Sequence, residues 1–345
     1  MASDRSGFAL PAVLAVTGVV TIIFLVAITA LSSLNGEARS ARERVRFLQS
    51  ALTAEAAIQF MAATEPFGNA ALMTGSPRRT AFSDDLYTVT PPGVEGAAVL
   101  LDGHRYEIEA AGPYAHPVFI SLQDQGGMLN LAHMDGVQLE RLGSFIGLPA
   151  DVSRNLGPLY LDYVDADDLE EINGAERPRY DGGGPANRYL LRGSELLSLL
   201  GVREGSAAAR WREVRDDIAV DHRRAVVNVN TASATTLEIL FGISRQQAQS
   251  AVGARERSPF LSMTDFVAAS GGIVPYDESQ VLTFPAGRIV YSIADTQSAW
   301  RYRARLTLTP SSAERPFWAN QTEMTEASGT AMASRDADRF PFTPR

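Results

Sequence analysis

The N-terminal part of the chain reads as an apolar run followed by an amphipathic stripe. No charged residue occurs from Phe8 to Gly36, which is longer than the about 20 residues that a transmembrane helix needs. Beyond the run, apolar residues recur at spacings of three and four, as on one face of a helix. These residues are Leu31, Leu34, Ala38, Ala41, Val45, Leu48, Leu52 and Ala56. The pattern predicts one long helix over 8–66, with its transmembrane part at 8–31, and the alternative is an anchor followed by a separate amphipathic helix.

A short polar leader, residues 1–7, precedes the apolar run and ends in Gly7. A secretory signal has a shorter apolar run of roughly 7–15 residues and a cleavage site at its far end. The long run therefore favours a cut before it, between Gly7 and Phe8, which leaves Phe8 as the new N-terminus. Arginines are more frequent after the run than before it, but long domains translocate largely regardless of flanking charge, so the charges do not decide the orientation.

Alternating and short apolar runs predict strands in two separate parts of the chain. Residues 97–111 contain two such runs around Asp102-Gly103, which is typical of a β-hairpin, and residues 118–124 predict a third strand. Strand character returns near the C-terminus, where the same pattern recurs. The strands predicted there are 288–295, 300–310 and 316–324.

A mostly helical block, residues 128–284, lies between these two β regions, which span 67–127 and 285–325. Because β segments border the block on both sides, the order of elements predicts an α+β fold, with one sheet into which a large α-helical domain is inserted. Residues 326–345 are polar with scattered prolines and are predicted to form a disordered tail.

Within the helical block, residues 159–180 are rich in carboxylates. Such a density is repulsive unless the side chains are solvated or share a hard cation, and calcium takes 6–8 oxygen ligands from flexible loops. The spacing is not that of an EF-hand, so by composition alone a solvated acidic loop is the stronger interpretation. The carboxylates are Asp162, Asp165, Asp167, Asp168, Glu170, Glu171 and Glu176.

A second motif, residues 226–266, predicts two helices joined by a short turn at Gly242-Ile243-Ser244. It resembles the helix-hairpin-helix of non-specific DNA-binding proteins, whose hairpin amides hold backbone phosphates. The usual hairpin reads Pro-Gly-Ile-Gly, whereas this one reads Phe-Gly-Ile-Ser. We therefore favour a hairpin used for packing over one that binds DNA.

Composition narrows the functional classes further. The formal charge of the 345-residue chain is -9 and its pI is about 5.1, which argues against nucleic acid as a main partner. All 31 basic residues are arginine and cysteine is absent, which excludes a Schiff-base lysine, a Walker lysine, thiol chemistry and thiolate zinc sites. The four histidines are isolated in sequence. Nothing in the sequence indicates an enzyme.

Several of these segments together resemble the GspK family, the large minor pseudopilins of the type II secretion system. Residues 162–168 (Asp-Tyr-Val-Asp-Ala-Asp-Asp) and 174–176 (Gly-Ala-Glu) are similar to the family's Asp-Trp-x-Asp-x-Asp and Gly-Ala-Glu segments, with Tyr163 in place of Trp. Residues 127–131 (Gly-Met-Leu-Asn-Leu) and 227–232 (Val-Asn-Val-Asn-Thr-Ala) match two further signatures. The resemblance extends to about residue 325 and implies a pilin-like fold.

The resemblance also implies how the N-terminus is processed and used. Prepilin peptidase would cut after Gly7 and methylate the amine of Phe8. Most pilin-like subunits have a glutamate at the fifth mature position, where it neutralises the amine of a neighbouring subunit in the apolar filament core, and here that position is Ala12. An unpaired charge in such a core would cost several kcal/mol. Together with the obstructing α-domain, Ala12 implies a place at the tip.

The implied protein is a non-enzymatic tip subunit of a pseudopilus that exports folded proteins across the outer membrane. It would assemble with the minor pseudopilins I and J above other pseudopilins, and it would begin as a single-pass inner-membrane protein with its C-terminal domain in the periplasm. The resemblance further implies calcium in the α-domain. The expected ligands are Asp165, Asp167, Asp168 and Glu176, with Asp162 and Glu171 as second choices.

Two alternatives follow from single features of the sequence. The hairpin motif would suit a membrane-tethered DNA receptor of an uptake system. The leader would equally suit a minor subunit of a type IV pilus.

Overall fold

A computed structural model describes most of the chain. The described residues are 9–74, 98–109, 116–182, 184–203, 207–223, 226–271, 280–296, 298–309, 314–326 and 337–341. The predicted leader and the cleavage site between Gly7 and Phe8 lie outside these residues.

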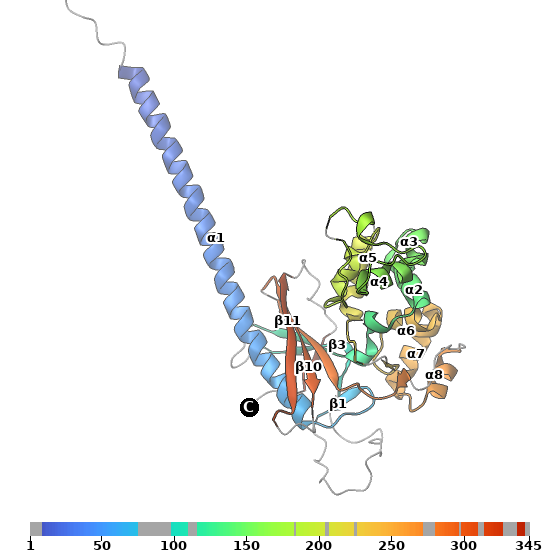
Figure 1. Cartoon of the computed structure of the whole chain (residues 1–345). Coiled ribbons are helices and arrows are strands. Elements are labelled where there is room, and N and C mark those ends of the chain that lie inside the picture. Colours follow the sequence, from blue (N-terminus) through green and yellow to red (C-terminus); the bar gives the residue numbers. More distant parts are fainter. Residues whose placement is uncertain are drawn as a thin grey trace, which may run out of the picture.

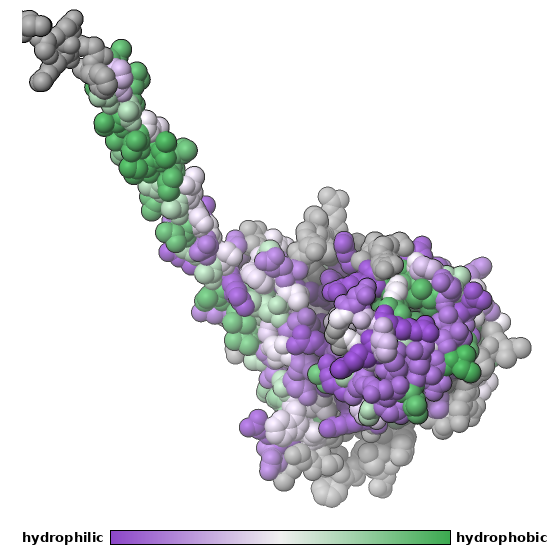
Figure 2. Space-filling model, turned by 45° about the horizontal axis from the view of Figure 1, so that its top comes forward, coloured by the Kyte–Doolittle hydropathy of each residue, from purple (hydrophilic) through white to green (hydrophobic). Residues whose placement is uncertain are grey.

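A single long helix, α1 (Ala9–Thr64), forms the N-terminal part of the structure (Figure 1). Its 56 residues correspond to about 84 Å at 1.5 Å per residue. The prediction of one continuous helix is confirmed, and the alternative of two separate helices is wrong. The N-terminal half of α1 is exposed, apolar and long enough to cross a membrane, and Figure 2 shows this hydrophobic surface projecting away from a mostly hydrophilic globular part.

The C-terminal half of α1 packs on one face of a sheet. Phe47, Ala51, Ala54, Ile58 and Met61 are buried there, at the spacing of three and four that aligns residues on one helix face. The same face carries a buried carboxylate, which accepts hydrogen bonds from two tyrosines of the sheet. Glu55 is that carboxylate, and it lies 2.5 Å from the hydroxyl of Tyr291 and 2.7 Å from that of Tyr302.

The apolar stripe predicted from the sequence lies on another face of α1. Leu34, Val45 and Leu52 of that stripe are 61%, 56% and 49% exposed. The stripe is real, but the sheet contacts the neighbouring face. The helix thus has one apolar face on its own sheet and a second apolar face open to solvent.

The main sheet has six strands in the order β11-β10-β9-β4-β3-β12. All neighbouring pairs are antiparallel except β12 with β3. A small two-stranded sheet, β1-β2, stands beside it. The strands are β1 (Ala71–Met73), β2 (Ala98–Leu100), β3 (Asp102–Ile108), β4 (Val118–Asp124), β9 (Arg288–Asp295), β10 (Trp300–Leu308), β11 (Phe317–Glu326) and β12 (Asp338–Arg339). The predicted α+β class, with its antiparallel-rich sheet and long N-terminal helix, is confirmed.

The predicted hairpin around Asp102-Gly103 is wrong. β2 pairs with β1, whereas β3 pairs with β4 and β12, so the two runs belong to different sheets. Gly103 has a φ of 85° and lies in a bulge of β3, where the register with β4 shifts. The Asp-Gly pair supplies the left-handed conformation that a bulge needs, instead of the turn of a hairpin.

A helical domain is inserted between the neighbouring strands β4 and β9, on the side of the sheet away from α1 (Figure 1). It has its own apolar core, separate from the core between α1 and the sheet. Its α-helices are α2 (Gly136–Ile146), α3 (Ala150–Arg154), α4 (Leu156–Val164), α5 (Ala207–Val214), α6 (Ala234–Phe241), α7 (Arg245–Arg257) and α8 (Met263–Ser270). Short parallel pairs join β5 (Leu129–Asn130) to β6 (Ile218–Ala219) and β7 (Val227–Asn228) to β8 (Val281–Leu282).

The prediction of a wholly disordered tail over 326–345 is also wrong. β12 adds a parallel edge strand to β3, and Phe340 is buried against Tyr106 with their ring centroids 5.9 Å apart. A polar composition did not reveal this single apolar anchor. Residues 327–336 and 342–345 lie outside the described part of the chain.

Candidate metal centre

Three carboxylates converge where α4 ends. Asp162 lies in the last turn of α4, Asp165 follows the helix as its C-cap, and Glu176 returns to the same place after a loop. One carboxylate oxygen from each residue lies within 4.8 Å of the others. The loop therefore gathers three negative charges at one point.

These carboxylates are poorly neutralised by the protein itself. Asp162 is fully buried and Glu176 is 3% exposed. Both carboxylate oxygens of Glu176 and one of Asp165 are buried without a donor in hydrogen-bonding geometry. Burial, and then the neighbouring carboxylates, raise the pKa of Asp165 and Glu176 above their ordinary values. Buried, unpaired carboxylates are unfavourable, and a shared cation would neutralise them.

Gly174 allows the loop to close around Asp162. A Cβ atom at Gly174 would lie 2.0 Å from the Oδ2 atom of Asp162, closer than any real contact. The backbone amide of Glu171 also donates to Asp162, at 3.1 Å from Oδ1. The loop backbone thus wraps directly around this carboxylate and fixes its position.

The structure separates the six candidate ligands predicted from the sequence. Asp165 and Glu176 lie in the cluster together with the second choice, Asp162. Asp167 instead caps a local turn by accepting from the amide of Leu169, and it is exposed.

Asp168 and Glu171 are likewise exposed and lie outside the three-residue cluster. Asn187 was not considered from the sequence, although its side-chain nitrogen donates to the carbonyl of Asp167 and its side-chain oxygen is buried without a donor. No local pattern in the sequence singles it out, because it comes from a separate loop.

The donor set fits a hard divalent cation. It consists of carboxylate oxygens only, and neither His nor Cys lies in the segment, which disfavours zinc. Carboxylates on an irregular loop suit the flexible coordination of calcium better than the near-octahedral geometry that magnesium demands. Asp162, Asp165 and Glu176 are the residues that would hold such an ion.

The Gly174→Ala variant tests this geometry. We expect it to destabilise the chain by about 1–3 kcal/mol, since overpacking displaces the Asp162 carboxylate, and to weaken any metal binding at the cluster. Gly253→Ala is the matched control, because Gly253 lies inside α7 with open space around its Cα and alanine is the better helix former. Chemical denaturation of both variants makes the comparison. An unchanged stability of Gly174→Ala would contradict the close approach.

A second polar cluster joins the inserted domain to the sheet. Asp124, at the end of β4, is fully buried and accepts hydrogen bonds from the side chains of Asn228 and Thr231 and from the backbone amide of Ala286. Burial raises the pKa of Asp124, and these hydrogen bonds oppose the shift. Gly127 packs so closely on Thr231 that a Cβ would lie 2.5 Å from its backbone. The cluster fixes both points at which the chain crosses between sheet and domain.

The hairpin motif is used for packing in this structure. α6 and α7 meet at Gly242, whose φ is 65°, and the guanidinium of Arg141 from α2 packs against that glycine. The amide of Ser244 is taken by the side chain of Gln247, and the Ser244 hydroxyl accepts from the amide of Gln247. Two amides at the start of α7, those of Ser244 and Gln247, are therefore taken within the protein.

Arg255 of the same motif also has a structural task. It is buried, donates to the backbone carbonyls of Val229 and Ala232, and lies 3.7 Å from the carboxylate of Asp102 in β3. Arg255 thus ties α7 to the sheet.

A comparison with models of protein families gives a match at this junction. Residues 227–282, from β7 to β8, match the model of the family described as type II secretion system (T2SS), protein K. Over these residues the chain is similar to the type II secretion system protein K family. The matched segment contains the hairpin motif, Arg255 and both junction residues of the Val-Asn-Val-Asn-Thr-Ala signature.

A longer sequence match agrees with the protein K family. The chain is 31% identical over 157 residues to type II secretion system protein K of Pseudomonas aeruginosa strain PAO1. The match covers 43% of this chain and 47% of the relative, so it spans about half of that protein's length. Among solved structures, a chain of the GspK-GspI-GspJ complex from the enterotoxigenic Escherichia coli type 2 secretion system aligns with a TM-score of 0.45 and 16% identity, over 61% of this chain and 80% of that chain.

Proposed function

We propose that this chain is a non-enzymatic minor pseudopilin that forms part of the tip of a type II secretion pseudopilus and initiates or caps its assembly. The observation that carries this proposal is that the two halves of α1 differ in their surroundings. Its first half is apolar all round, and its second half lies on the sheet while a second apolar stripe remains exposed. A helix of this kind can span a membrane before assembly and can later pack against the helices of neighbouring subunits.

The tip position is supported by two features of the chain. Ala12 lies on the exposed, apolar part of α1, so this helix offers no carboxylate at the place where a subunit would receive the amine of the next one. The inserted domain adds bulk beside the sheet (Figure 1), where it would obstruct a subunit stacked above. The amine of Phe8 would remain able to pair with a glutamate of a subunit below.

The proposed partners follow from the similarity to the protein K family. They are the minor pseudopilins I and J, the other pseudopilins below them, and the prepilin peptidase that processes the leader. The chain would be anchored in the inner membrane by α1, with its sheet and inserted domain in the periplasm. Nucleic acid is not a proposed partner, because the chain has a formal charge of -9 and the amides of Ser244 and Gln247 in the hairpin are taken within the protein.

Processing gives a direct prediction. Cleavage between Gly7 and Phe8 is expected to remove residues 1–7 and to leave one added methyl on the new N-terminus, because a pilin helix keeps its apolar segment. Intact-mass analysis of the membrane-extracted protein measures both changes. A mature protein that begins after the apolar run would mean an ordinary secretory signal and would contradict the proposal.

We further propose that Asp162, Asp165 and Glu176 hold calcium in the inserted domain. The unpaired oxygens of Asp165 and Glu176 support this assignment. The ion would neutralise three carboxylates and so hold the loop after α4 against the end of that helix. Its role would be structural, because the site serves to close a loop and not to position a substrate.

Cysteine crosslinking tests the proposed use of α1, since the chain has no cysteine of its own. Leu52→Cys places a thiol on the exposed stripe, and Ala54→Cys, a buried position on the sheet side, is the matched control. We expect crosslinks from position 52, and none from position 54, to single-cysteine helices of the minor pseudopilins I or J. Absence of crosslinks along the whole exposed stripe would contradict the packing role. A shift of duplex DNA by the full chain at physiological salt would instead favour the DNA receptor.

A further inference from the structure

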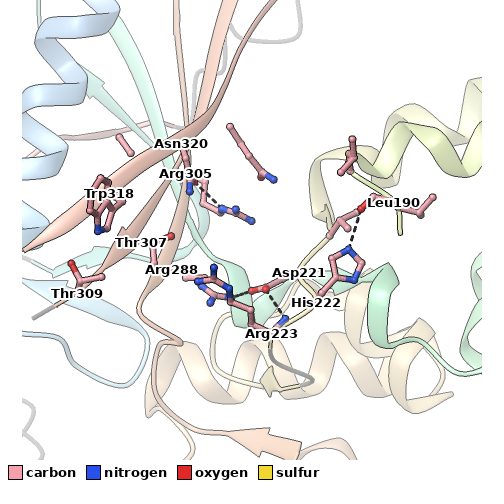
Figure 3. A pocket seen from close by; sticks show the side chains of 14 residues that line it. Leu190, Asp221, His222, Arg223, Arg288, Arg305, Thr307, Thr309, Trp318 and Asn320 are labelled. Atoms are coloured by element: carbon pink, nitrogen blue, oxygen red, sulfur yellow. Dashed lines mark hydrogen bonds and ion pairs between the residues drawn. The ribbon is translucent and has the colours of Figure 1, made fainter. Parts of the chain in front are cut away.

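The face of the sheet that looks toward the inserted domain carries a ladder of arginines. Residues Arg301, Arg303 and Arg305 alternate along β10 with Tyr302 and Ala304, which are buried against α1. Because side chains alternate across a strand, the three guanidinium groups share the opposite face. Next to them, β10, β11 and the loops of the inserted domain enclose a cavity of about 550 Å³ (Figure 3).

Most of these arginines have a carboxylate partner in the inserted domain. Asp216 lies 2.7 Å from Arg301 and 3.4 Å from Arg303. Asp221 forms a close ion pair with Arg288 of β9, whose side chain points into the cavity in Figure 3. Asp216 and Asp221 thus neutralise Arg301, Arg303 and Arg288.

Arg305 differs from its neighbours on the ladder. Its Nε donates to the side-chain oxygen of Asn320 at 3.1 Å, and within the described part of the chain no carboxylate lies in ion-pair distance of it. Burial, and then the nearby Arg288 and Arg223, lower the pKa of Arg305. Three guanidinium groups thus line the cavity, with the single carboxylate of Asp221 among them.

The backbone of β11 is strained at the same place. Gln321, which lines the cavity, has a φ of 52°, a left-handed conformation that is unfavourable for a residue with a side chain. It lies in a bulge, since Arg303 pairs with Glu323 whereas Arg305 pairs with Asn320. Bulges re-aim side chains near binding sites, and strained residues cluster there. The strained backbone of β11 is therefore a second, independent indication of a binding site.

Apolar and aromatic side chains border the cavity on both sides of its arginines. Trp318 from β11 lies on one side at 44% exposure, and Leu191 lies on the other at 61% exposure. Thr307 adds a hydroxyl beside Arg305. This combination suits a protein segment in which a carboxylate side chain is flanked by apolar residues, because arginine pairs with a carboxylate in a bidentate way.

We propose that this cavity binds an acidic segment of a partner protein, whose carboxylate pairs with Arg305 and reaches Arg288. The segment would lie between Trp318 and Leu191, and its apolar residues would cover both side chains. The inference rests on the charges and the shape of the cavity and is independent of a place in the pseudopilus, since it is tested on the isolated chain.

The test uses the full chain in neutral detergent and two peptides, acetyl-Gly-Leu-Glu-Glu-Leu-Gly-amide and its Gln-for-Glu counterpart. The chain has three tryptophans, so labelling with fluorotryptophan gives three fluorine signals, and Trp318→Phe identifies the one from the cavity. We expect the acidic peptide to shift the Trp318 signal saturably, and the neutral peptide to leave it unchanged.

Variants of the arginines decide whether the site is the one proposed. Arg305→Gln should weaken binding at least about tenfold, as expected for the loss of a hydrogen bond between charged groups. Arg305→Lys should retain part of the affinity. Arg257→Gln, on an exposed arginine at the end of α7, is the matched control and should bind as the parent chain does. Melting curves of each variant establish that it is folded.

Three outcomes would overturn the proposal. The first is equal binding of the acidic and the neutral peptide. The second is binding of the acidic peptide that a folded Arg305→Gln or Arg305→Lys variant leaves unchanged. The third is a Trp318 shift produced by sulfate or phosphate as strongly as by the peptide, which would mean an adventitious ion only.

Discussion

We expect calcium to raise the melting temperature of the full chain above that measured in EGTA. The expected gain is about 2.7 kcal/mol of unfolding free energy at a calcium concentration one hundred times the dissociation constant. The reason is that Asp162, Asp165 and Glu176 bring buried and unpaired carboxylate oxygens together, so the folded chain should bind the ion far better than the unfolded one. Thermal melts with calcium, magnesium and EGTA make the measurement, and calcium should have the largest effect.

Two variants separate the cluster from the rest of the acidic loop. Asp165→Asn should abolish the calcium response and should also melt higher than the parent chain in EGTA, because one carboxylate of the repulsive cluster has been neutralised. Asp168→Asn is the matched control on an exposed carboxylate of the same loop, and it should keep the calcium response. Equal melting temperatures of the parent chain with and without calcium, together with no bound calcium by elemental analysis, would contradict calcium binding. The segment would then be a solvated acidic loop.

Asp124→Ala should destabilise the chain by about 3 kcal/mol or more. Asp124 is fully buried and accepts from Asn228, Thr231 and Ala286, and buried donors that lose a charged acceptor carry a desolvation cost of about 1–3 kcal/mol each. Chemical denaturation followed by circular dichroism measures the change. Hydrogen exchange should show the largest loss of protection around β7 and the end of β4.

An exposed carboxylate of the inserted domain provides the control for Asp124. Glu213 on α5 is exposed, and Glu213→Ala should change the stability by less than about 0.5 kcal/mol. A loss of stability of similar size in both variants would mean that removing any negative charge has this effect, and that the hydrogen bonds of Asp124 are not its cause. A loss below about 1 kcal/mol in Asp124→Ala would contradict the role of the junction cluster.

The sequence predicted the long helix and most strands of the sheet because these depend on local periodicity. α1 extends from Ala9 to Thr64, and β4 and β9 span the residues expected of them. The periodicity could not show which apolar face of α1 meets the sheet, since Phe47 and Leu48 lie on adjacent faces and are equally apolar in sequence. That choice depends on partners that are distant along the chain, such as Tyr291 and Tyr302.

The two errors in the sheet have the same origin. The Asp102-Gly103 pair is a good local signal for a turn, but β1 takes β2 as its partner, and Gly103 then serves as a bulge in β3. Strand β12 has only two residues, too few for a periodic pattern, and it is anchored by the packing of Phe340 on Tyr106. Long-range pairing decided both cases.

The candidate metal centre was located by composition but not resolved into ligands. The density of carboxylates singled out this segment, and three of the six expected residues lie together in the structure. The selection depends on the direction in which each residue leaves α4 and on Gly174, which lets the loop approach Asp162. Asp167 is instead used in a local turn, which sequence spacing alone does not distinguish from ligation.

Co-expression of the full chain with the minor pseudopilins I and J tests the central claim most directly. We predict that the chain, extracted in mild detergent and purified through its own tag, carries I and J in a complex with one copy of each, measured by native mass spectrometry. Leu52→Arg, which places a charge on the exposed apolar stripe of α1, should weaken this complex. Recovery of the chain without I and J, under conditions in which all three are present and folded, would contradict the account.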